Sequence, residues 1–285
     1  MPSVSMVIPA YNEEKGIGSI LTHLKAVMTK QEMEYELIVV DDGSTDGTAD
    51  AVQRQAGVRL IQHHSNRGYR AAIKTGIRQA RYDWIAIIDA DGTYPPSAMP
   101  ILLQEIEHCD MVVGARPTRE IPAVRRPAKW LLARLAEYMA ETRIPDLNSG
   151  MRVFRKDIAL SYFNILPSTF SFTITITIAF LSDHYLVKFV PIPYESREGR
   201  SKIRPVQDTL TFIQLILRTV MYFNPLKILL PLSFLLLLLA VLVGAYSLVV
   251  YGRVMDITVI TLTMAALQIA VVAMIADMVQ KKNKV

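Results

Sequence analysis

Two long apolar stretches near the C-terminus place the strongest constraint on how this chain can fold. Residues 228–251 and 257–276 contain no charged side chain, and the polar residues among them are neutral, such as Gln268. Each stretch is long enough to cross a hydrocarbon core of about 30 Å as a helix. The segment between them, residues 252–256, is too short to form a domain. The sequence therefore predicts a two-helix transmembrane hairpin within residues 225–285.

Basic residues flank both ends of this predicted hairpin. They are Arg218, Lys227, Lys281, Lys282 and Lys284. Because lysine and arginine concentrate in cytoplasmic loops, we expect both termini to be cytoplasmic. The single cysteine, Cys109, excludes an intramolecular disulfide and fits a reducing compartment. We therefore expect an integral membrane protein with its larger domain on the cytoplasmic face, and a homo-oligomer through the membrane helices is a further expectation.

Residues 1–204 have the pattern of an α/β domain. Short apolar strands separated by helical patterns are expected at residues 4–8, 36–40, 58–62, 85–88, 111–114 and 186–192. This alternation predicts a doubly wound, mostly parallel sheet that binds its ligands at the carboxyl ends of the strands. Residues 170–180 have the period of a strand because threonine alternates with apolar residues, but we expect a helix packed under the active site.

Carboxylates follow three of the predicted strands. Glu13 follows the first, Asp42 the second, and Asp89 and Asp91 the strand at 85–88. Two aspartates separated by one small residue form a hard-oxygen site that suits Mg²⁺ or Mn²⁺ carrying a phosphate. The alternative is a strand that ends in an ordinary polar turn. The chain lacks the glycine motifs of dinucleotide and P-loop sites, which favours a nucleotide site built from carboxylates and a metal.

The net charge of +5 could reflect a nucleic acid, a membrane surface or anionic substrates as partners, and the long apolar C-terminal part favours the last two. A helix at about 121–142 carries Arg125, Arg126 and Lys129 among apolar residues, and residues 205–224 are also amphipathic. Both could lie in a membrane interface, and packing on the domain surface is the alternative. The chain shows no nucleic-acid-binding motif, so we expect no nucleic-acid partner.

A second cationic segment contains Arg197, Arg200 and Lys202 around a glycine. Arginine and lysine so placed could clamp a diphosphate, and a solvated loop is the alternative.

Four motifs occur together in one order along the chain. They are Pro9-Ala10-Tyr11-Asn12-Glu13, Asp41-Asp42-Gly43-Ser44-Thr45-Asp46-Gly47, Asn66-Arg67-Gly68 and Asp89-Ala90-Asp91. In these the chain resembles glycosyltransferase family 2, whose fold is GT-A. Within that family it is most similar to dolichol-phosphate mannose synthases and bacterial polyprenyl-phosphate glucosyltransferases. The grounds are the segments 114–116, 149–152 and 199–202 and the two C-terminal helices.

The resemblance implies a role for each matching residue. The nucleotide would be held by Pro9, Tyr11, Glu13, Val40 and Asp42. The sugar-diphosphate would meet Asp89, Ala90 and Asp91, with Asp91 on the metal; Arg116, Arg197 and Lys202 would face phosphates, with Arg200 as a rival to Arg197. The chain departs from the pattern at Thr93, where many relatives place a glutamine ligand, and at Arg70, where relatives often have glycine.

The implied reaction moves one hexose, with inversion, from a nucleotide sugar of the GDP-mannose or UDP-glucose type to a polyprenyl or dolichyl phosphate. Such an acceptor is already an anion and needs cationic positioning more than a strong base. The candidates for that positioning are Arg116, Arg125, Arg126, Lys129 and Arg152. Asp146 could act as a base, orient a partner or cap its loop. The alternatives are a polysaccharide or glycolipid synthase of the same superfamily and a non-catalytic nucleotide-binding scaffold.

Overall fold

The computed structural model describes residues 2–117, 134, 137–138, 141–163, 172–193, 224–253 and 256–282. The chain divides into two compact units, Met1–Ile203 and Arg204–Val285. Several predicted features lie outside the described residues: most of the helix at 121–142 with Arg125, Arg126 and Lys129, the cations Arg197, Arg200 and Lys202, and the segment 205–223.

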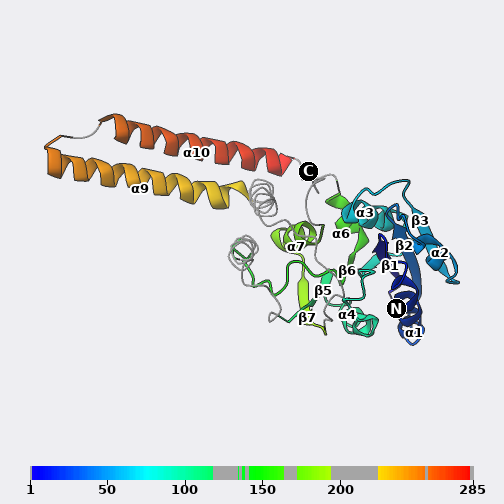
Figure 1. Cartoon of the computed structure of the whole chain (residues 1–285). Coiled ribbons are helices and arrows are strands. Elements are labelled where there is room, and N and C mark those ends of the chain that lie inside the picture. The colour runs from blue at the N-terminus through cyan, green and yellow to red at the C-terminus, as the bar shows by residue number, and fades with distance from the viewer. Residues whose placement is uncertain are drawn as a thin grey trace. The chain divides into compact units, whose positions relative to one another are not determined.

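The first unit is built on a seven-stranded sheet with the order β3-β2-β1-β4-β6-β5-β7 (Figure 1). Its strands are β1 (Val4–Ala10), β2 (Tyr35–Asp41), β3 (Val58–Gln62), β4 (Trp84–Ile87), β5 (Met111–Ala115), β6 (Arg152–Arg155) and β7 (Val187–Pro191). Neighbouring strands are parallel except that β6 runs antiparallel to both β4 and β5. The prediction of a doubly wound, mostly parallel sheet is therefore confirmed.

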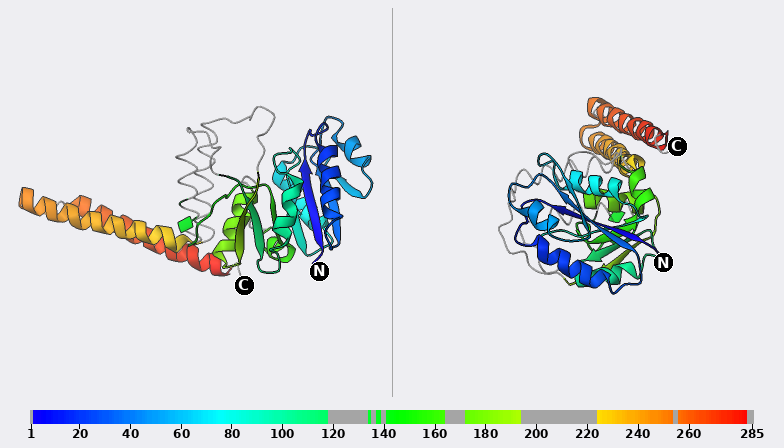
Figure 2. Two further views of the ribbon diagram at one scale, coloured as in Figure 1. Left: turned by 90° about the horizontal axis from the view of Figure 1, so that it is seen from below. Right: turned by 90° about the vertical axis from the view of Figure 1, so that its right-hand side faces the viewer.

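Helices cover both faces of the sheet. They are α1 (Ile17–Met28), α2 (Thr48–Gln53), α3 (Tyr69–Gln79), the short 3-10 turn η1 (Pro96–Ala98), α4 (Met99–Leu103), α6 (Lys156–Ser161) and α7 (Phe172–Ser182). Helices α1 and α4 lie on one face, and α3, α6 and α7 lie on the other (Figure 2). The stretch with the strand-like threonine period is thus a helix, α7, as expected, and every residue from Phe172 to Leu181 is buried.

The alternation of side chains along β1 explains how the core forms. Met6 and Ile8 pack with the apolar face of α1, whereas Val7 points to the opposite face, under α3. At Gly76 of α3 an added Cβ would lie 2.3 Å from Val7 Cγ1, so only glycine lets the helix approach the strand this closely. This close packing fixes the start of α3 at the carboxyl edge of the sheet.

The second unit is a hairpin of two helices, α9 (Pro225–Tyr251) and α10 (Asp256–Lys282). Both are long and apolar enough to cross a membrane. Where they pack together, small residues are buried: Ser233, Ala240 and Ser247 of α9, and Ala266 and Ala273 of α10. The spacing of seven keeps one face of each helix toward the other. Ser233 Oγ also donates to the carbonyl of Ala266 at 2.7 Å.

Candidate active site

Loops from several strands meet at the carboxyl edge of the sheet. Because β1, β2 and β4 are parallel, Tyr11, Asp42 and Asp89 all follow strands that end at this edge. The antiparallel β6 begins there instead, with Arg152 in register with Ile87 of β4. Strand β5 delivers Arg116 to the same edge. Residues far apart in the sequence thus form one candidate site.

The loop after β1 is joined to the loop after β2 by hydrogen bonds. The backbone N–H of Asn12 donates to Ser44 Oγ at 2.9 Å, and the Asn12 side-chain oxygen accepts from the backbone N–H of Thr45 at 2.8 Å. The N–H of Glu13 donates to Thr48 Oγ1 at 2.8 Å. These bonds fix Glu13 at the wall of the site, where it is half-buried.

The other residues predicted to hold the nucleotide are also at this edge. Pro9 and Val40 are buried partners in register on β1 and β2. Tyr11, just beyond β1, is 43% exposed and available to a ligand. Their roles in nucleotide binding stay predictions.

Asp42 is buried and braces the loop that follows β3. One carboxylate oxygen contacts Nδ1 of His63 at 2.7 Å and accepts the backbone N–H of Arg67 at 3.0 Å. The other accepts the N–H of Gly68 at 2.7 Å. The same carboxylate that is predicted to meet the nucleotide therefore also organises the Asn66-Arg67-Gly68 loop, which the sequence did not indicate.

Asp89 is held between Tyr69 and Gly150, neither of which was predicted to be a site residue. Tyr69 Oη donates to Asp89 Oδ1 at 2.6 Å, and the backbone of Gly150 lies so close that an added Cβ would be 1.9 Å from Asp89 Oδ2. Burial, with the nearby charge of Asp91, raises the pKa of Asp89 to about 6, against the opposing effect of the Tyr69 hydrogen bond. A carboxyl group so placed favours a compensating cation.

Asp91 is oriented by Thr93. Its Oδ1 accepts the hydroxyl of Thr93 at 2.7 Å and the backbone N–H of the same residue at 3.2 Å. Thr93, which stands where many relatives have a glutamine, thus directs Asp91 in this structure.

The carboxylates at this edge could hold a divalent metal ion only if substrate phosphate oxygens and water supplied the remaining ligands. Over the described ranges, no group of three or more His, Cys, Asp and Glu side chains gathers as a metal site. Mg²⁺ and Mn²⁺ are commonly held by one or two carboxylates together with phosphate oxygens and water. Asp89 and Asp91 fit that pattern.

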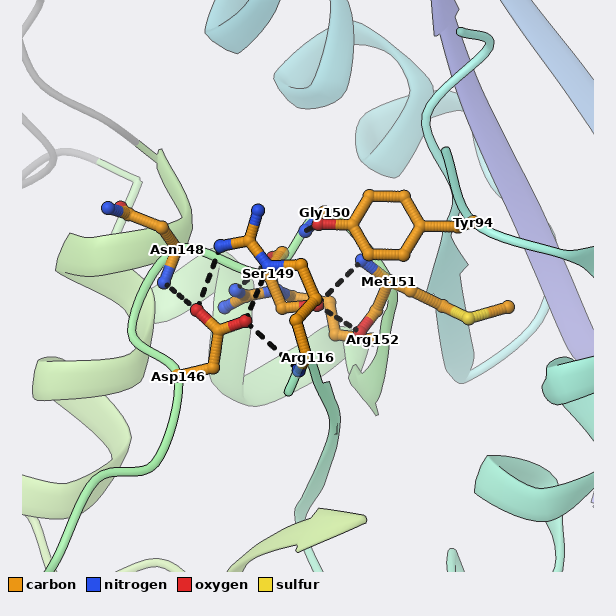
Figure 3. A network of polar contacts seen from close by, with 8 residues as sticks. All are labelled: Tyr94, Arg116, Asp146, Asn148, Ser149, Gly150, Met151 and Arg152. Atoms are coloured by element: carbon orange, nitrogen blue, oxygen red, sulfur yellow. Dashed lines mark hydrogen bonds and ion pairs between the residues drawn. The ribbon is translucent and has the colours of Figure 1, made fainter. Parts of the chain in front are cut away.

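Arg116 and Asp146 form a two-point ion pair (Figure 3), and the charge of Arg116 lies close enough to Asp89 to act on its pKa, in the lowering direction. Arg116 Nε donates to Asp146 Oδ2 at 2.6 Å and a terminal nitrogen donates to Oδ1 at 2.9 Å. Asp146 also accepts the backbone N–H of Asn148 at 3.0 Å. Burial alone would raise the pKa of Asp146, but the Arg116 guanidinium holds it below the ordinary value. This favours the orienting and loop-capping roles that the sequence left open, because a carboxylate so engaged is a weak base.

The pair should make stability depend on pH in a defined direction. Because the folded state lowers the pKa of Asp146, its contribution is fully present above the ordinary value of 3.8 and is lost as the pH falls through the folded-state pKa. We expect Asp146→Asn to lower the free energy of unfolding by about 2 kcal/mol at pH 7 and by almost nothing well below pH 3.8. Urea titrations across this range measure the difference.

Asp157→Asn is the matched control for Asp146→Asn. It removes the same chemical group from the exposed Arg155–Asp157 pair, whose side chains are 48% and 62% exposed. Exposed pairs contribute little, so this variant should stay close to the wild type at every pH. An Asp146→Asn deficit that did not shrink on acidification would contradict the assignment.

Arg152 is placed differently from its predicted contact with the acceptor phosphate. Its side chain is fully buried, and Nε donates to the carbonyl of Ser149 at 3.2 Å. One terminal nitrogen donates to the carbonyl of Thr173 and to Thr177 Oγ1, both at 2.9 Å. The guanidinium is enclosed between the Ser149-Gly150 turn and α7, so in this structure it supports the turn and does not reach a ligand at the surface.

Tyr94 supports the same turn from the other side. Its buried hydroxyl accepts the backbone N–H of Gly150 at 2.8 Å (Figure 3). Burial raises the pKa of Tyr94 to about 12, so the hydroxyl stays protonated. Arg152, Tyr94 and Asp89 therefore surround the peptide of Gly150.

The match to known families is consistent with this geometry. Residues 5–163 match Glycosyl transferase family 2, which is more than half of the chain. The chain belongs to this family.

Curated relatives carry names of lipid-phosphate sugar transferases. Dolichyl-phosphate hexose transferase of Haloferax volcanii is 30% identical over 206 residues, which cover 71% of this chain and 87% of the relative. Undecaprenyl-phosphate 4-deoxy-4-formamido-L-arabinose transferase of Pseudomonas syringae pv. syringae is 30% identical over 86% of this chain and 73% of the relative. Dodecaprenyl-phosphate galacturonate synthase of Rhizobium johnstonii is 30% identical over 54% of this chain, and the match spans only about half of that relative, 48%.

Solved structures share the fold. Glucosyl-3-phosphoglycerate synthase of Mycobacterium tuberculosis, in complex with Mn²⁺ and UDP-glucose, superposes with a TM-score of 0.59 at 21% identity over 77% of this chain and 78% of that chain. Mannosyl-3-phosphoglycerate synthase of Rubrobacter xylanophilus gives a TM-score of 0.60 at 19% identity, over 77% and 74% of the two chains. At these identities the likeness establishes the fold alone, which is the predicted GT-A type.

Proposed function

We propose that this protein is an inverting glycosyltransferase that moves one hexose from a nucleotide sugar to a polyprenyl or dolichyl phosphate at the cytoplasmic face of a membrane. The observation that carries the proposal is that Asp89, Asp91 and the Arg116–Asp146 ion pair all lie at one edge of the sheet in a family 2 fold. The names of the relatives support a polyprenyl phosphate as acceptor.

The donor would bind across the loops after β1, β2 and β4. In the proposal, Glu13 and Asp42 meet the nucleotide and the two aspartates after β4 meet the diphosphate. A divalent cation held by Asp89 and Asp91 would neutralise charge on the departing nucleoside diphosphate. The Mn²⁺ and UDP-glucose bound by the mycobacterial synthase support such a donor. Asp91 is kept in place for this task by Thr93.

The acceptor phosphate would be positioned by Arg116. Asp146 holds this guanidinium at two points, so its position is set before the acceptor arrives. A phosphate oxygen is already charged near neutral pH and can attack the anomeric carbon directly. The proposed reaction therefore assigns Asp146 the orientation of Arg116 and gives no residue the task of a strong general base.

The hairpin would hold the catalytic unit at the membrane. Its two helices have mean hydropathies of 2.8 and 2.3 over their most apolar windows, and most of their surface is exposed, as expected for contact with lipid. A polyprenyl chain stays in the bilayer, so an enzyme that uses its phosphate must work beside it. The cytoplasmic orientation rests on the positive residues that flank the spans.

A product assay tests this function. Membranes containing the full chain are supplied with polyprenyl phosphate, Mn²⁺ and radiolabelled UDP-glucose, GDP-mannose or other nucleotide sugars in turn, and the lipids are separated by thin-layer chromatography. We expect one donor to give a lipid carrying a single sugar, and EDTA to abolish the product. A polymer would identify a polysaccharide synthase instead, and no product with any donor while the nucleotide still binds would identify a scaffold.

A further inference from the structure

The centre of α10 carries an amide that points away from its partner helix. The candidate span covers Ile257–Gln280, and Gln268 lies at its middle. Ala266 is buried against α9, and a position two residues further along lies about 200° around a helix. Gln268 is accordingly exposed, and within the described part of the chain its amide has no hydrogen-bond partner.

Four other polar side chains in the hairpin satisfy their hydroxyl groups internally. Ser233 donates across the hairpin to Ala266. Ser247 donates to the carbonyl of Gly244 at 2.9 Å, and Thr261 and Thr263 donate to carbonyls four residues earlier at 2.7 and 2.8 Å. Gln268 differs from them because its amide is directed outward at mid-span.

Lipid cannot satisfy this amide. Hydrocarbon chains offer no hydrogen-bond partner, and the middle of a span is too far from either interface for so short a side chain to reach water. A primary amide carries both donors and an acceptor, so two glutamines related by a two-fold axis can bond reciprocally. A second copy of the same helix is therefore a complete partner, and interhelical bonds of this kind stabilise helix pairs in membranes.

The neighbours of Gln268 suit close approach of two helices. Ala265 and Thr261, about one and two turns earlier, lie near the same face and are small, and Thr261 has already paired its hydroxyl. On the other side of Gln268 the face continues with Val272 and Ile275, which are 51% and 55% exposed. We call these five residues the Gln268 face.

We propose that the Gln268 face is a self-association surface through which α10 packs against α10 of a second copy of this chain within the membrane. The proposal rests on the membrane insertion proposed above. It adds a specific surface and a specific bond, from the Gln268 amide of one copy to that of the other.

Association is measured on the full chain in lipid vesicles, by energy transfer between donor- and acceptor-labelled copies as the lipid-to-protein ratio is increased. We expect Gln268→Leu to weaken association about tenfold and Gln268→Asn to retain most of it. Met274→Leu is the control, because Met274 is exposed on α10 but lies about 120° away from Gln268 around the helix. It should associate like the wild type.

Cross-linking tests the orientation independently. With Cys109 replaced by serine, Ala265→Cys should give a covalent dimer on oxidation in membranes, and Met274→Cys should not. The proposal would be overturned if Gln268→Leu associated as strongly as the wild type, or if cysteine at position 274 cross-linked in preference to cysteine at position 265. Carbonate extraction tests membrane insertion separately from self-association. Release of the wild-type chain from membranes by carbonate would refute the insertion of the hairpin itself.

Discussion

Replacing Asp91 with alanine is expected to lower sugar transfer by on the order of 10³-fold, the scale of losing one preorganised electrostatic contact to a developing charge. In the proposed site, Asp91 holds the cation that neutralises the leaving diphosphate. Its carboxylate accepts two hydrogen bonds from Thr93, and it lies just past the end of a buried strand. The substitution should therefore affect the chemistry far more than the fold.

One further variant separates charge from shape at this position, and a second variant outside the site is the control. Asp91→Asn keeps an oxygen that can accept the Thr93 hydrogen bonds but removes the negative charge, and it should lose nearly as much activity as Asp91→Ala. Glu105→Ala removes a carboxylate outside the site, from its 2.6 Å ion pair with Lys188, and should keep its activity. Transfer rates and calorimetric Mn²⁺ binding in the presence of UDP measure both effects. Full activity of Asp91→Asn would refute the metal assignment.

The sheet and the hairpin could be predicted because their signals are local. The strands at 58–62 and 111–115 follow directly from short apolar runs between polar loops, and the two helices of the hairpin follow from length and hydropathy. The sequence after Pro95-Pro96 also predicts a helix over 97–107, but the structure has only η1 and α4 there, ending at Leu103. The residues beyond it, from 104 to 110, form turns, and only Ile106 of these is buried, so the helical pattern there had little core to pack against.

The surroundings of Asp89 could not be predicted in the same way. Tyr69 reaches Asp89 because α3 starts at the carboxyl edge of the sheet, and Gly150 reaches it because β6 enters from that edge in the antiparallel direction. Both contacts depend on tertiary structure. The burial of Arg152 could not be predicted from the sequence either. Arginine is rarely fully buried, and the acceptors of Arg152 on α7 come from a stretch whose sequence period resembled a strand.

Gly150→Ala is expected to reduce transfer about 100-fold while leaving the protein folded. The added Cβ would lie 1.9 Å from Asp89 Oδ2 and 2.5 Å from its Cγ, so the two groups cannot both keep their positions. The Gly150 peptide cannot easily retreat, because Tyr94 accepts its N–H and Arg152 bonds the preceding carbonyl. The carboxylate of Asp89 is the end of a side chain and can rotate away.

That rotation is why activity and stability should separate. Moving a carboxylate costs little folding free energy, but a displacement of about 1 Å in a catalytic group can cost 100-fold in rate. We therefore expect a thermal transition near that of the wild type, a lower kcat, and weaker Mn²⁺ binding. Gly18→Ala is the matched control. Gly18 lies in helix α1, and a Cβ added there would meet only Gln55 Nε2, at 3.8 Å. It should keep full activity and gain up to about 1 kcal/mol of stability from helix propensity. If Gly150→Ala transferred sugar at the wild-type rate, Asp89 would not need the position that the Gly150 peptide enforces, and its role in holding the cation would have to be abandoned.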